Sequence, residues 1–355
     1  MTGTANKLCL SFFLISSILQ LMDEAEVKSM VPLLDKNGIP LKDKWARHPY
    51  FAYSRRNLKC FPLSLWQWNG CTVINSRKEY MLSLFFSDLG SCGFFQISYA
   101  DLKKGSCTSL SSRKCFTLYR TGLMDASGEN ESATYLDSDN LMTLSMIKKD
   151  LDRYIIFNAP FLTLPDGSRG LLGDFSLSQT LEKESLCTVS GWAGNDRKFR
   201  LCEMIPALEV SGGFIRKNGK KDNLAEDNAL AILEWQRGVW NRKSSITQAF
   251  ASSATDEGTV SLTFGFGEHD NAVYINDRLY NTGRVTMNGN IIRDEKGCMD
   301  IHFTRIAGHE DRYRGPGVSL RRRQDYGVFD GNMIIEGKEI KVPSLPGVLC
   351  TTVTP

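Results

Sequence analysis

The stretch Met333-Ile-Ile-Glu-Gly-Lys-Glu-Ile-Lys-Val342 predicts a β-hairpin whose turn centres on Glu336-Gly337. Glycine suits such a turn because it accepts a positive φ angle at little steric cost. Val210 to Arg216, followed by Asn218-Gly219, has a comparable pattern in the middle of the chain. Apolar residues that alternate with polar ones, bounded by turn residues, are typical of antiparallel β-strands.

The same short apolar bursts recur along the rest of the chain. Two segments favour a helix instead, namely Asn140 to Tyr154 and Leu224 to Ala231. Many short strands at near-regular spacing indicate a sandwich or a barrel. We therefore expect an all-β protein of two consecutive antiparallel β-barrels with few short helices. Side chains could fill these barrels or leave space for a ligand, and periodicity does not decide between the two. The bursts are Leu82–Phe86, Gly93–Ser98, Arg153–Phe157, Thr259–Phe266, Ala272–Ile275 and Asp300–Arg305.

The length of 355 residues predicts two domains, because single cores of this size are uncommon. We expect a signal or extension at residues 1–28. An N-terminal β-barrel-like domain would then occupy residues 29–200, and a C-terminal one residues 201–355.

An apolar run from Leu8 to Met22 has the length of the apolar part of a signal peptide. It is shorter than the roughly 20 residues that a membrane-spanning helix requires, so no stable membrane span is predicted. Asp23 makes cleavage after Ala25 unfavourable. Two interpretations stay open: a secretory or endomembrane protein, or a cytoplasmic protein with an N-terminal extension.

Charge and cysteine patterns exclude two classes of function. The net charge is +3, and a nucleic-acid-binding protein would carry a large, clustered basic excess. The ten cysteines form no C-x-x-C pair and none stands at metal-ligand spacing from a histidine, which argues against a zinc site. These cysteines could be buried thiols or disulfides, and their number does not decide.

The most distinctive segment is Ile232-Leu-Glu-Trp-Gln-Arg-Gly-Val-Trp-Asn-Arg242. On a strand, Glu234 and Gln236 would face one side and Trp235 and Arg237 the other. One interpretation is structural, with Arg237 stacked on a tryptophan and paired with a buried Glu234. The other interpretation is a ligand pocket in which Glu234 is the acid, Arg237 positions it, and Trp235 and Trp240 line the walls.

Glu234-Trp-Gln-Arg-Gly-Val-Trp240 resembles the acid-Trp-x-Arg-Gly-Val-Trp signature of the bacterial domain of unknown function 2804 family. The resemblance extends over nearly all of residues 31 to 345. It includes Val31–Gly38, Trp45–Arg47, Leu65–Trp68, Leu208–Gly212, Asp270–Leu279 and Tyr326–Ile340.

This family is similar to a wider set of lipocalin-like two-barrel proteins that includes carotenoid hydratases, tocopherol cyclase and fungal Diels–Alder cyclases. The resemblance therefore implies two lipocalin-like barrels. One departure concerns Ser245-Ile-Thr-Gln-Ala-Phe-Ala251, where the family usually has a Trp-x-Trp strand. If those aromatic residues line a cavity, the cavity of this chain is wider or more polar, although drift in a packed core is also consistent with the change.

The resemblance implies an enzyme of the cyclase, isomerase or hydratase type that acts on a flexible apolar polyene, terpenoid or polyketide-like molecule without a cofactor. Folding the substrate and donating one proton would suffice for such a reaction. Glu234 would be the acid, and Arg237 and Gln248 would hold a carbonyl group. The residues expected to line the substrate-binding site are Trp235, Trp240, Phe250, Trp66 and Trp68.

Two alternatives remain open. The first is a non-enzymatic, lipocalin-like carrier of a lipid, isoprenoid or pigment, in which Glu234 and Arg237 form a structural pair. The second is a protein with a packed interior whose partners bind only at its surface.

Overall fold

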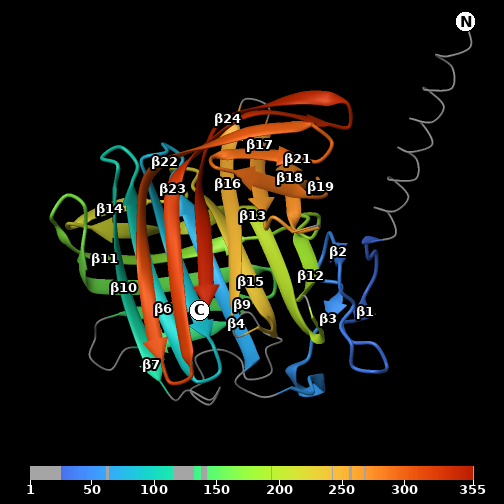
Figure 1. Cartoon of the computed structure of the whole chain (residues 1–355). Helices are drawn as coiled ribbons and strands as arrows, with labels where there is room; N and C mark the ends of the chain where they lie inside the picture. Colours follow the sequence, from blue (N-terminus) through green and yellow to red (C-terminus); the bar gives the residue numbers. More distant parts are fainter. Residues whose placement is uncertain are drawn as a thin grey trace, which may run out of the picture.

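The computed structural model describes residues 25–60, 64–115, 132–136, 142–192, 194–241, 243–255, 258–267 and 269–354. Strands form a 13-stranded sheet, a 9-stranded sheet and a 2-stranded sheet (Figure 1). The 13-stranded sheet, the first sheet below, contains β2 (Lys44–Ala46), β4 (Leu65–Ile74), β5 (Tyr80–Asp88), β6 (Cys92–Asp101), β7 (Ser106–Cys115), β8 (Ala133–Leu136), β9 (Thr143–Lys149), β10 (Asp152–Thr163), β11 (Arg169–Ser178), β12 (Leu186–Trp192), β13 (Asn195–Lys217), β14 (Lys220–Asn223) and β15 (Leu230–Val239).

The 9-stranded sheet, the second sheet below, follows in the chain. It contains β16 (Ser244–Thr255), β17 (Gly258–Phe264), β18 (Asn271–Ile275), β19 (Arg278–Asn281), β20 (Val285–Asn288), β21 (Ile291–Asp294), β22 (Met299–Gly315), β23 (Val318–Ile335) and β24 (Lys338–Thr354). The small parallel pair consists of β1 (Val31–Pro32) and β3 (Phe51–Ala52), and the 3₁₀ turn η1 spans Arg55–Asn57. The prediction of an all-β antiparallel fold is confirmed.

The hairpin at the end of the chain forms as predicted. Ile335 pairs with Lys338, so that the turn consists of Glu336 and Gly337 alone. Both residues have positive φ angles, 51° and 78°. A two-residue turn with two positive φ angles matches the right-handed twist of the strands that it joins.

The two predicted helices are wrong. The described part of Asn140 to Tyr154 belongs to β9 and β10, and Leu224 to Ala231 leads into β15. In β9, Leu144 and Met146 are buried while Ile147 is 44% exposed. Burial therefore follows the period of two that a strand requires.

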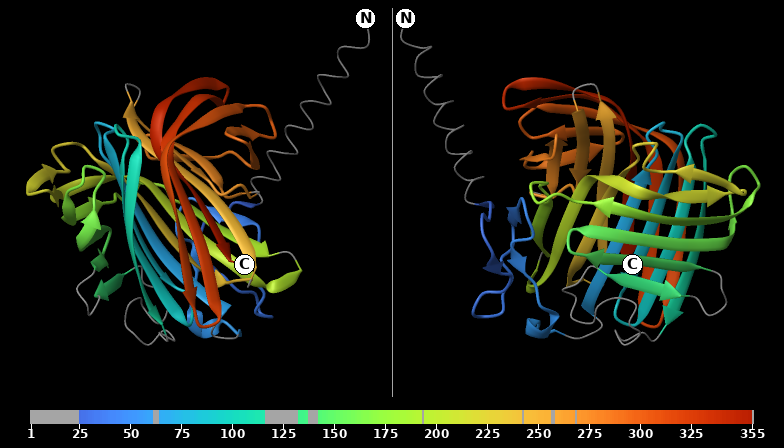
Figure 2. Two further views of the ribbon diagram at one scale, coloured as in Figure 1. Left: turned by 60° about the vertical axis from the view of Figure 1, so that its left-hand side comes forward. Right: turned by 180° about the vertical axis from the view of Figure 1, so that it is seen from behind.

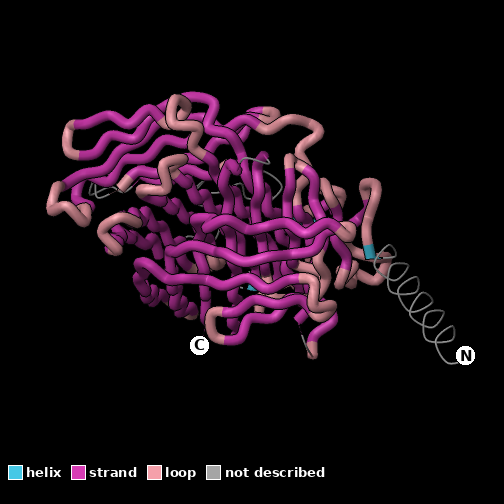
Figure 3. Tube along the Cα trace, turned by 90° about the horizontal axis from the view of Figure 1, so that it is seen from above, coloured by secondary structure: helices cyan, strands magenta, loops and turns pink. Residues whose placement is uncertain are grey.

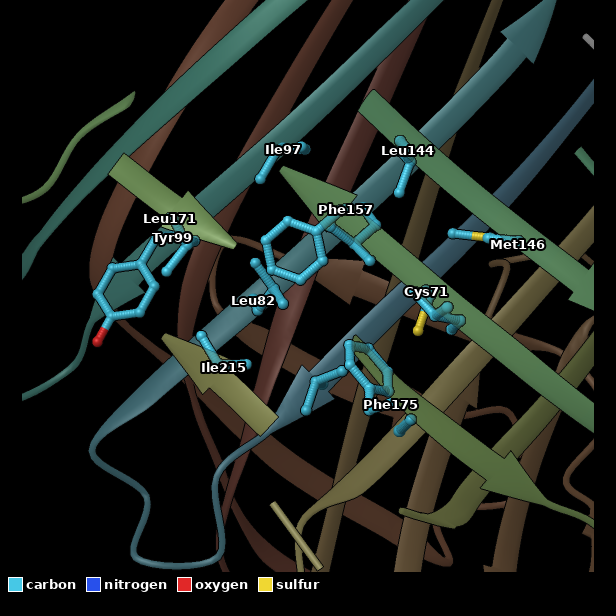
Figure 4. Close-up of a cluster of buried hydrophobic side chains, with 14 of the residues drawn as sticks. Cys71, Leu82, Ile97, Tyr99, Leu144, Met146, Phe157, Leu171, Phe175 and Ile215 are labelled. Carbon is cyan, nitrogen blue, oxygen red and sulfur yellow. The ribbon is translucent and has the colours of Figure 1, made fainter. Parts of the chain in front are cut away.

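The first sheet folds back over itself. Strands β9 to β11 cross the strands β4 to β7 at a steep angle (Figure 2). Apolar side chains fill the space between the two layers; Figure 4 shows Leu82 and Ile97 from one layer near Phe157 and Leu171 from the other. This apolar cluster is the core of the N-terminal half.

The opposite face of β4 to β7 and β15 packs against β16 and β22 to β24 of the second sheet. The long strands of the second sheet run beside β6 and β7, and the view from above shows the stacked strand layers (Figures 1 and 3). We call the side chains enclosed between the two sheets the inter-sheet layer. It is apolar toward Ile232, Phe250 and Val348, and aromatic toward Trp66, Trp240 and Tyr313. Polar side chains separate these two parts.

The chain passes from the first sheet to the second between Val239 and Ser244. The domain boundary predicted at residues 200 and 201 falls inside β13, which pairs with β11, β12, β14 and β15 of the first sheet. The division into two domains remains a prediction. Most of the predicted N-terminal signal or extension, residues 1–24, lies outside the described residues.

Candidate functional site

Glu234 lies on β15 and faces the inter-sheet layer. It is only 5% exposed. The indole Nε1 of Trp68 donates a 2.6 Å hydrogen bond to its Oε1, and the side-chain amide of Gln236 donates to the same oxygen. A buried carboxylate requires such donors because removal from water is costly.

The second carboxyl oxygen of Glu234 lies over Gly70, its cross-strand partner on β4. A Cβ atom on residue 70 would stand 3.0 Å from Oε2 of Glu234. A side chain at residue 70 would therefore require this carboxyl group to move by a few tenths of an ångström. One oxygen of Glu234 is held by two donors, while the other faces a position without a side chain.

A cluster of tryptophans flanks Glu234 in the same layer. Trp240 is stacked on Trp66 with ring centroids 5.4 Å apart, and its ring lies 4.5 Å from that of Trp68. Trp192 adds a fourth ring at 5.3 Å from Trp240. The predicted residues Trp66, Trp68 and Trp240 are thus brought together with the acid.

Gln248 and Phe250 reach this layer from β16 of the second sheet. Nε2 of Gln236 donates a 2.9 Å hydrogen bond to Oε1 of Gln248, which joins the two sheets. Phe250 packs in the apolar part beside Ile232. In the segment Ser245–Ala251, Ala249 and Ala251 face away, toward the core of the second sheet.

Arg237 and Trp235 lie on the opposite face of β15, as the strand period predicted. Arg237 is fully buried, and its guanidinium lies 4.4 Å from the ring centroid of Trp235. Its Nη1 donates to the backbone oxygens of Trp68 and Gln236 at 3.0 and 2.7 Å. The structure therefore separates the two predicted catalytic residues. Glu234 faces the second sheet, whereas Arg237 faces the other side of the first sheet and donates hydrogen bonds to the backbone of β4 and β15.

Two small cavities open on that opposite face. One, of about 20 Å³, is lined by Glu234, Trp235, Glu203, Arg153 and others. The other, of about 160 Å³, shares Trp235, Glu203 and Lys148 with the first. Sequence reasoning missed Glu203, Lys148 and Arg153, because their approach depends on how the first sheet folds over itself.

A larger cavity of about 570 Å³ lies between β2 and β12 of the first sheet and the segment before β18 of the second. Its lining includes Lys44, His269, Asp270 and Arg284. Asp270 forms a buried ion pair with Arg200 and accepts a 2.9 Å hydrogen bond from Ser190. No sequence pattern near residue 270 indicates this cavity.

The polar part of the inter-sheet layer contains a buried cation. Arg322 of β23 is 4% exposed and lies 3.9 Å from the ring centroid of Phe85. Its Nη1 donates a 3.4 Å hydrogen bond to Oγ1 of Thr352. Three other polar atoms have no hydrogen-bond partner among the described residues: Nε of Arg322, Oε1 of Gln236 and Oε1 of Gln324. Such atoms are costly in a dry interior.

Three further findings concern the described part of the chain. No group of three histidine, cysteine or acidic side chains is placed to hold a metal ion. The nine described cysteines are free thiols. No helix there is both long and apolar enough to cross a membrane.

Several solved structures are similar to the chain. AttH from Nitrosomonas europaea, itself described as putative, is 10% identical, with a TM-score of 0.41, over 82% of this chain and 92% of that one. Kievitone hydratase from Nectria haematococca is 12% identical, with a TM-score of 0.39, over 85% and 95% of the two chains. CghA is 9% identical, with a TM-score of 0.41, over 91% and 96%.

A search of curated proteins found no match to the chain. A family model, by contrast, matches residues 24–351, which include every residue of the candidate site. The chain therefore belongs to the family described as domain of unknown function (DUF2804).

Proposed function

We propose that this protein is an enzyme that isomerises, cyclises or hydrates a flexible apolar small molecule in its inter-sheet layer. Glu234 would be the acid–base group. The observation that supports this most directly is the asymmetry of its carboxyl group: Trp68 and Gln236 hold Oε1, while Oε2 lies over Gly70. The free oxygen is the one that would exchange a proton.

The reaction needs no cofactor. Oε2 of Glu234 would give its proton to a carbon–carbon double bond of the substrate, and the faces of Trp68 and Trp240 would stabilise the resulting cation. Loss of another proton to the carboxylate completes an isomerisation or a cyclisation with no net change in atoms. Capture of water by the cation, followed by loss of a proton from that water, gives hydration instead.

The remaining predicted residues have supporting roles in this proposal. Gln248 would orient a polar group of the substrate from the second sheet, and Phe250 and Trp66 would bound the apolar space. Trp235 lies on the opposite face of β15 and would not contact this space. Arg237 would act as a positioning residue, because it fixes the backbone beside Trp68 and Gln236.

The first experiment is organic extraction and native mass spectrometry of the protein from its own source, which identifies a bound apolar molecule. Turnover of the acyclic or unhydrated precursor of that molecule is then assayed in the Glu234→Gln variant. We expect loss of turnover by about 100-fold or more with binding retained, since proton transfer contributes about 10²–10⁴-fold.

Glu203→Gln is the matched control. Glu203 is also a buried glutamate, 7% exposed, but it lies on the other face of the first sheet. Its variant should keep most of the activity. Full activity in a stable Glu234→Gln protein would refute the proposal.

A second candidate is a non-enzymatic carrier of a lipid, isoprenoid or pigment. The 570 Å³ cavity supports it, because its volume suits a small ligand and Lys44 and Arg284 in its lining could bind an acidic head group. Glu234 is not among its lining residues. Titration with cis-parinaric acid, a fluorescent polyene, tests this candidate. Saturable binding that Glu234→Gln leaves unchanged, with no turnover of the extracted molecule's precursor, would favour the carrier.

A further inference from the structure

A second group of reactive side chains lies in the inter-sheet layer, away from Glu234. Nδ1 of His309, on β22, lies 3.7 Å from Sγ of Cys107 on β7. Nε2 of the same ring lies 3.3 Å from Oδ2 of Asp311. A thiol, an imidazole and a carboxylate in this order form the arrangement in which a base activates a nucleophile and a third group orients the base.

Neighbouring side chains hold Asp311 and His309 in place. Ser109 donates a 3.1 Å hydrogen bond to Oδ2 of Asp311, and the amide of Gln96 donates to the same oxygen. Oγ of Ser98 lies 3.2 Å from Nε2 of His309. The imidazole is thus fixed from β6 as well as from its own strand.

We propose that Cys107 is a nucleophilic thiol, activated by His309 and Asp311, that forms a thioether with α,β-unsaturated carbonyl compounds. His309 takes the proton of the thiol, and the sulfur forms a bond to the β-carbon of the acceptor. The π electrons of the double bond move to the carbonyl oxygen as an enolate. The proton on His309 then passes to the α-carbon, so that atoms and electrons balance without an oxidant.

The surroundings of Cys107 fit an acceptor with an apolar chain and a carbonyl group. Ala307 and Tyr326 belong to the apolar cluster against which Leu102 and the thiol of Cys107 pack. The amide of Gln96 and the hydroxyl of Ser98 lie on the polar side, near His309. Thiolates attack such polarisable carbon centres readily.

Cys107 is also within reach of small molecules. It is partly exposed, whereas the thiols of Cys202 and Cys350 in the same layer are buried. Its strand, β7, stands at the edge of the first sheet, where β6 is its one partner among the described strands. Figure 1 shows β7 beside the long strands of the second sheet.

The charged state of His309 supports this geometry. Burial alone would lower the pKa of His309, but hydrogen bonds to Asp311 and Cys107 outweigh it and raise that pKa to about 9. The groups that face the ring are Cys107 from β7, Asp311 from β22 and the stacked phenol of Tyr326 from β23, together with the uncharged Gln96 and Ser98 from β6. A proton taken from the thiol therefore stays on the imidazole at neutral pH.

The test is limited labelling of the reduced full-length protein with N-ethylmaleimide, itself an unsaturated carbonyl compound, read out by peptide mass spectrometry. Cys298 is the internal reference, since it is also partly exposed but its sulfur contacts the backbone oxygen of Lys296. At pH 6.5 we expect Cys107 to react about 10-fold faster than Cys298 or more.

His309→Gln should reduce the labelling rate of Cys107 to that of the reference thiol, and Asp311→Asn should also slow it. The comparison within the unaltered protein needs no variant and so does not depend on how the variants fold. Cys107 labelled no faster than Cys298 at pH 6.5 would overturn the proposal. An unchanged rate in a folded His309→Gln protein would do the same.

Discussion

The indole Nε1 of Trp68 donates a 2.6 Å hydrogen bond to Oε1 of Glu234, a residue 166 positions further along the chain. The two residues lie on neighbouring antiparallel strands, where Trp68 pairs with Gln236 and Glu234 with Gly70. This hydrogen bond joins the aromatic part of the inter-sheet layer to Glu234, the proposed acid. The other side chains of the candidate site are arranged around these two residues.

Trp68→Phe should destabilise the protein by about 1.5–3 kcal/mol beyond the loss of ring size, because a buried carboxylate then loses one of its two donors. Urea unfolding measures the change. Trp240→Phe is the control, since its Nε1 has no hydrogen-bond partner among the described residues although its ring belongs to the same cluster. Equal losses of stability in the two variants would contradict the role assigned to the hydrogen bond.

Gly70→Ala should displace the carboxyl group of Glu234. The added methyl group would stand 3.0 Å from Oε2, and relief of this contact by moving the side chain weakens the bonds at Oε1. We expect a loss of about 1–3 kcal/mol. Thermal and urea unfolding provide the measurement.

Gly212→Ala is the matched control for that experiment. Its Cβ would meet Oγ of Ser176 at 3.4 Å, an ordinary contact. This variant should be neutral or slightly stabilising, because alanine loses less chain entropy on folding than glycine. A Gly70→Ala protein as stable as the Gly212→Ala protein would show that Glu234 is not held tightly over β4.

Asp270→Asn should cost about 3–5 kcal/mol of stability, since it leaves the buried guanidinium of Arg200 without its counter-charge. The side chains of Arg200 and Asp270 are 6% and 9% exposed. Asp300→Asn removes the exposed partner of Arg293, where the side chains are 60% and 55% exposed, and should cost less than about 1 kcal/mol. If the two substitutions were equally mild in urea unfolding, the Arg200–Asp270 pair would not stabilise the fold.

Local sequence patterns predicted the β-strands of this structure better than they predicted the contacts between strands. Alternation identified the strands, and the same period placed Glu234 and Arg237 on opposite faces of β15. The helix predicted near Leu144 failed because Leu144 and Ile147 are three apart, a spacing that helices share with mixed strand patterns. In the structure, Leu144 is buried and Ile147 is exposed.

Pairings between distant segments had no sequence signal. Cys107 and His309 are separated by 202 positions, and their approach depends on how the two sheets pack. The same holds for Gln236 and Gln248, which are close in sequence but belong to different sheets. Residue type alone could identify such side chains as candidate site residues, but only the packing of the sheets brings them together.

The last prediction concerns the pH dependence of stability. The pKa of His309 in the folded protein is about 9, above the value of about 6.5 for an unfolded chain. The imidazolium therefore stabilises the fold fully below about pH 6.5, and this contribution is lost as the pH rises through 9. Its size should be on the order of 3 kcal/mol. Urea unfolding from pH 6 to 9.5 should show the difference in the free energy of unfolding between the wild-type protein and His309→Gln decreasing over this range.

Asp311→Asn removes the carboxylate that stabilises the imidazolium, so it should weaken this dependence of stability on pH. A difference between the wild-type protein and His309→Gln that stays constant with pH would mean that His309 is neutral in the folded protein.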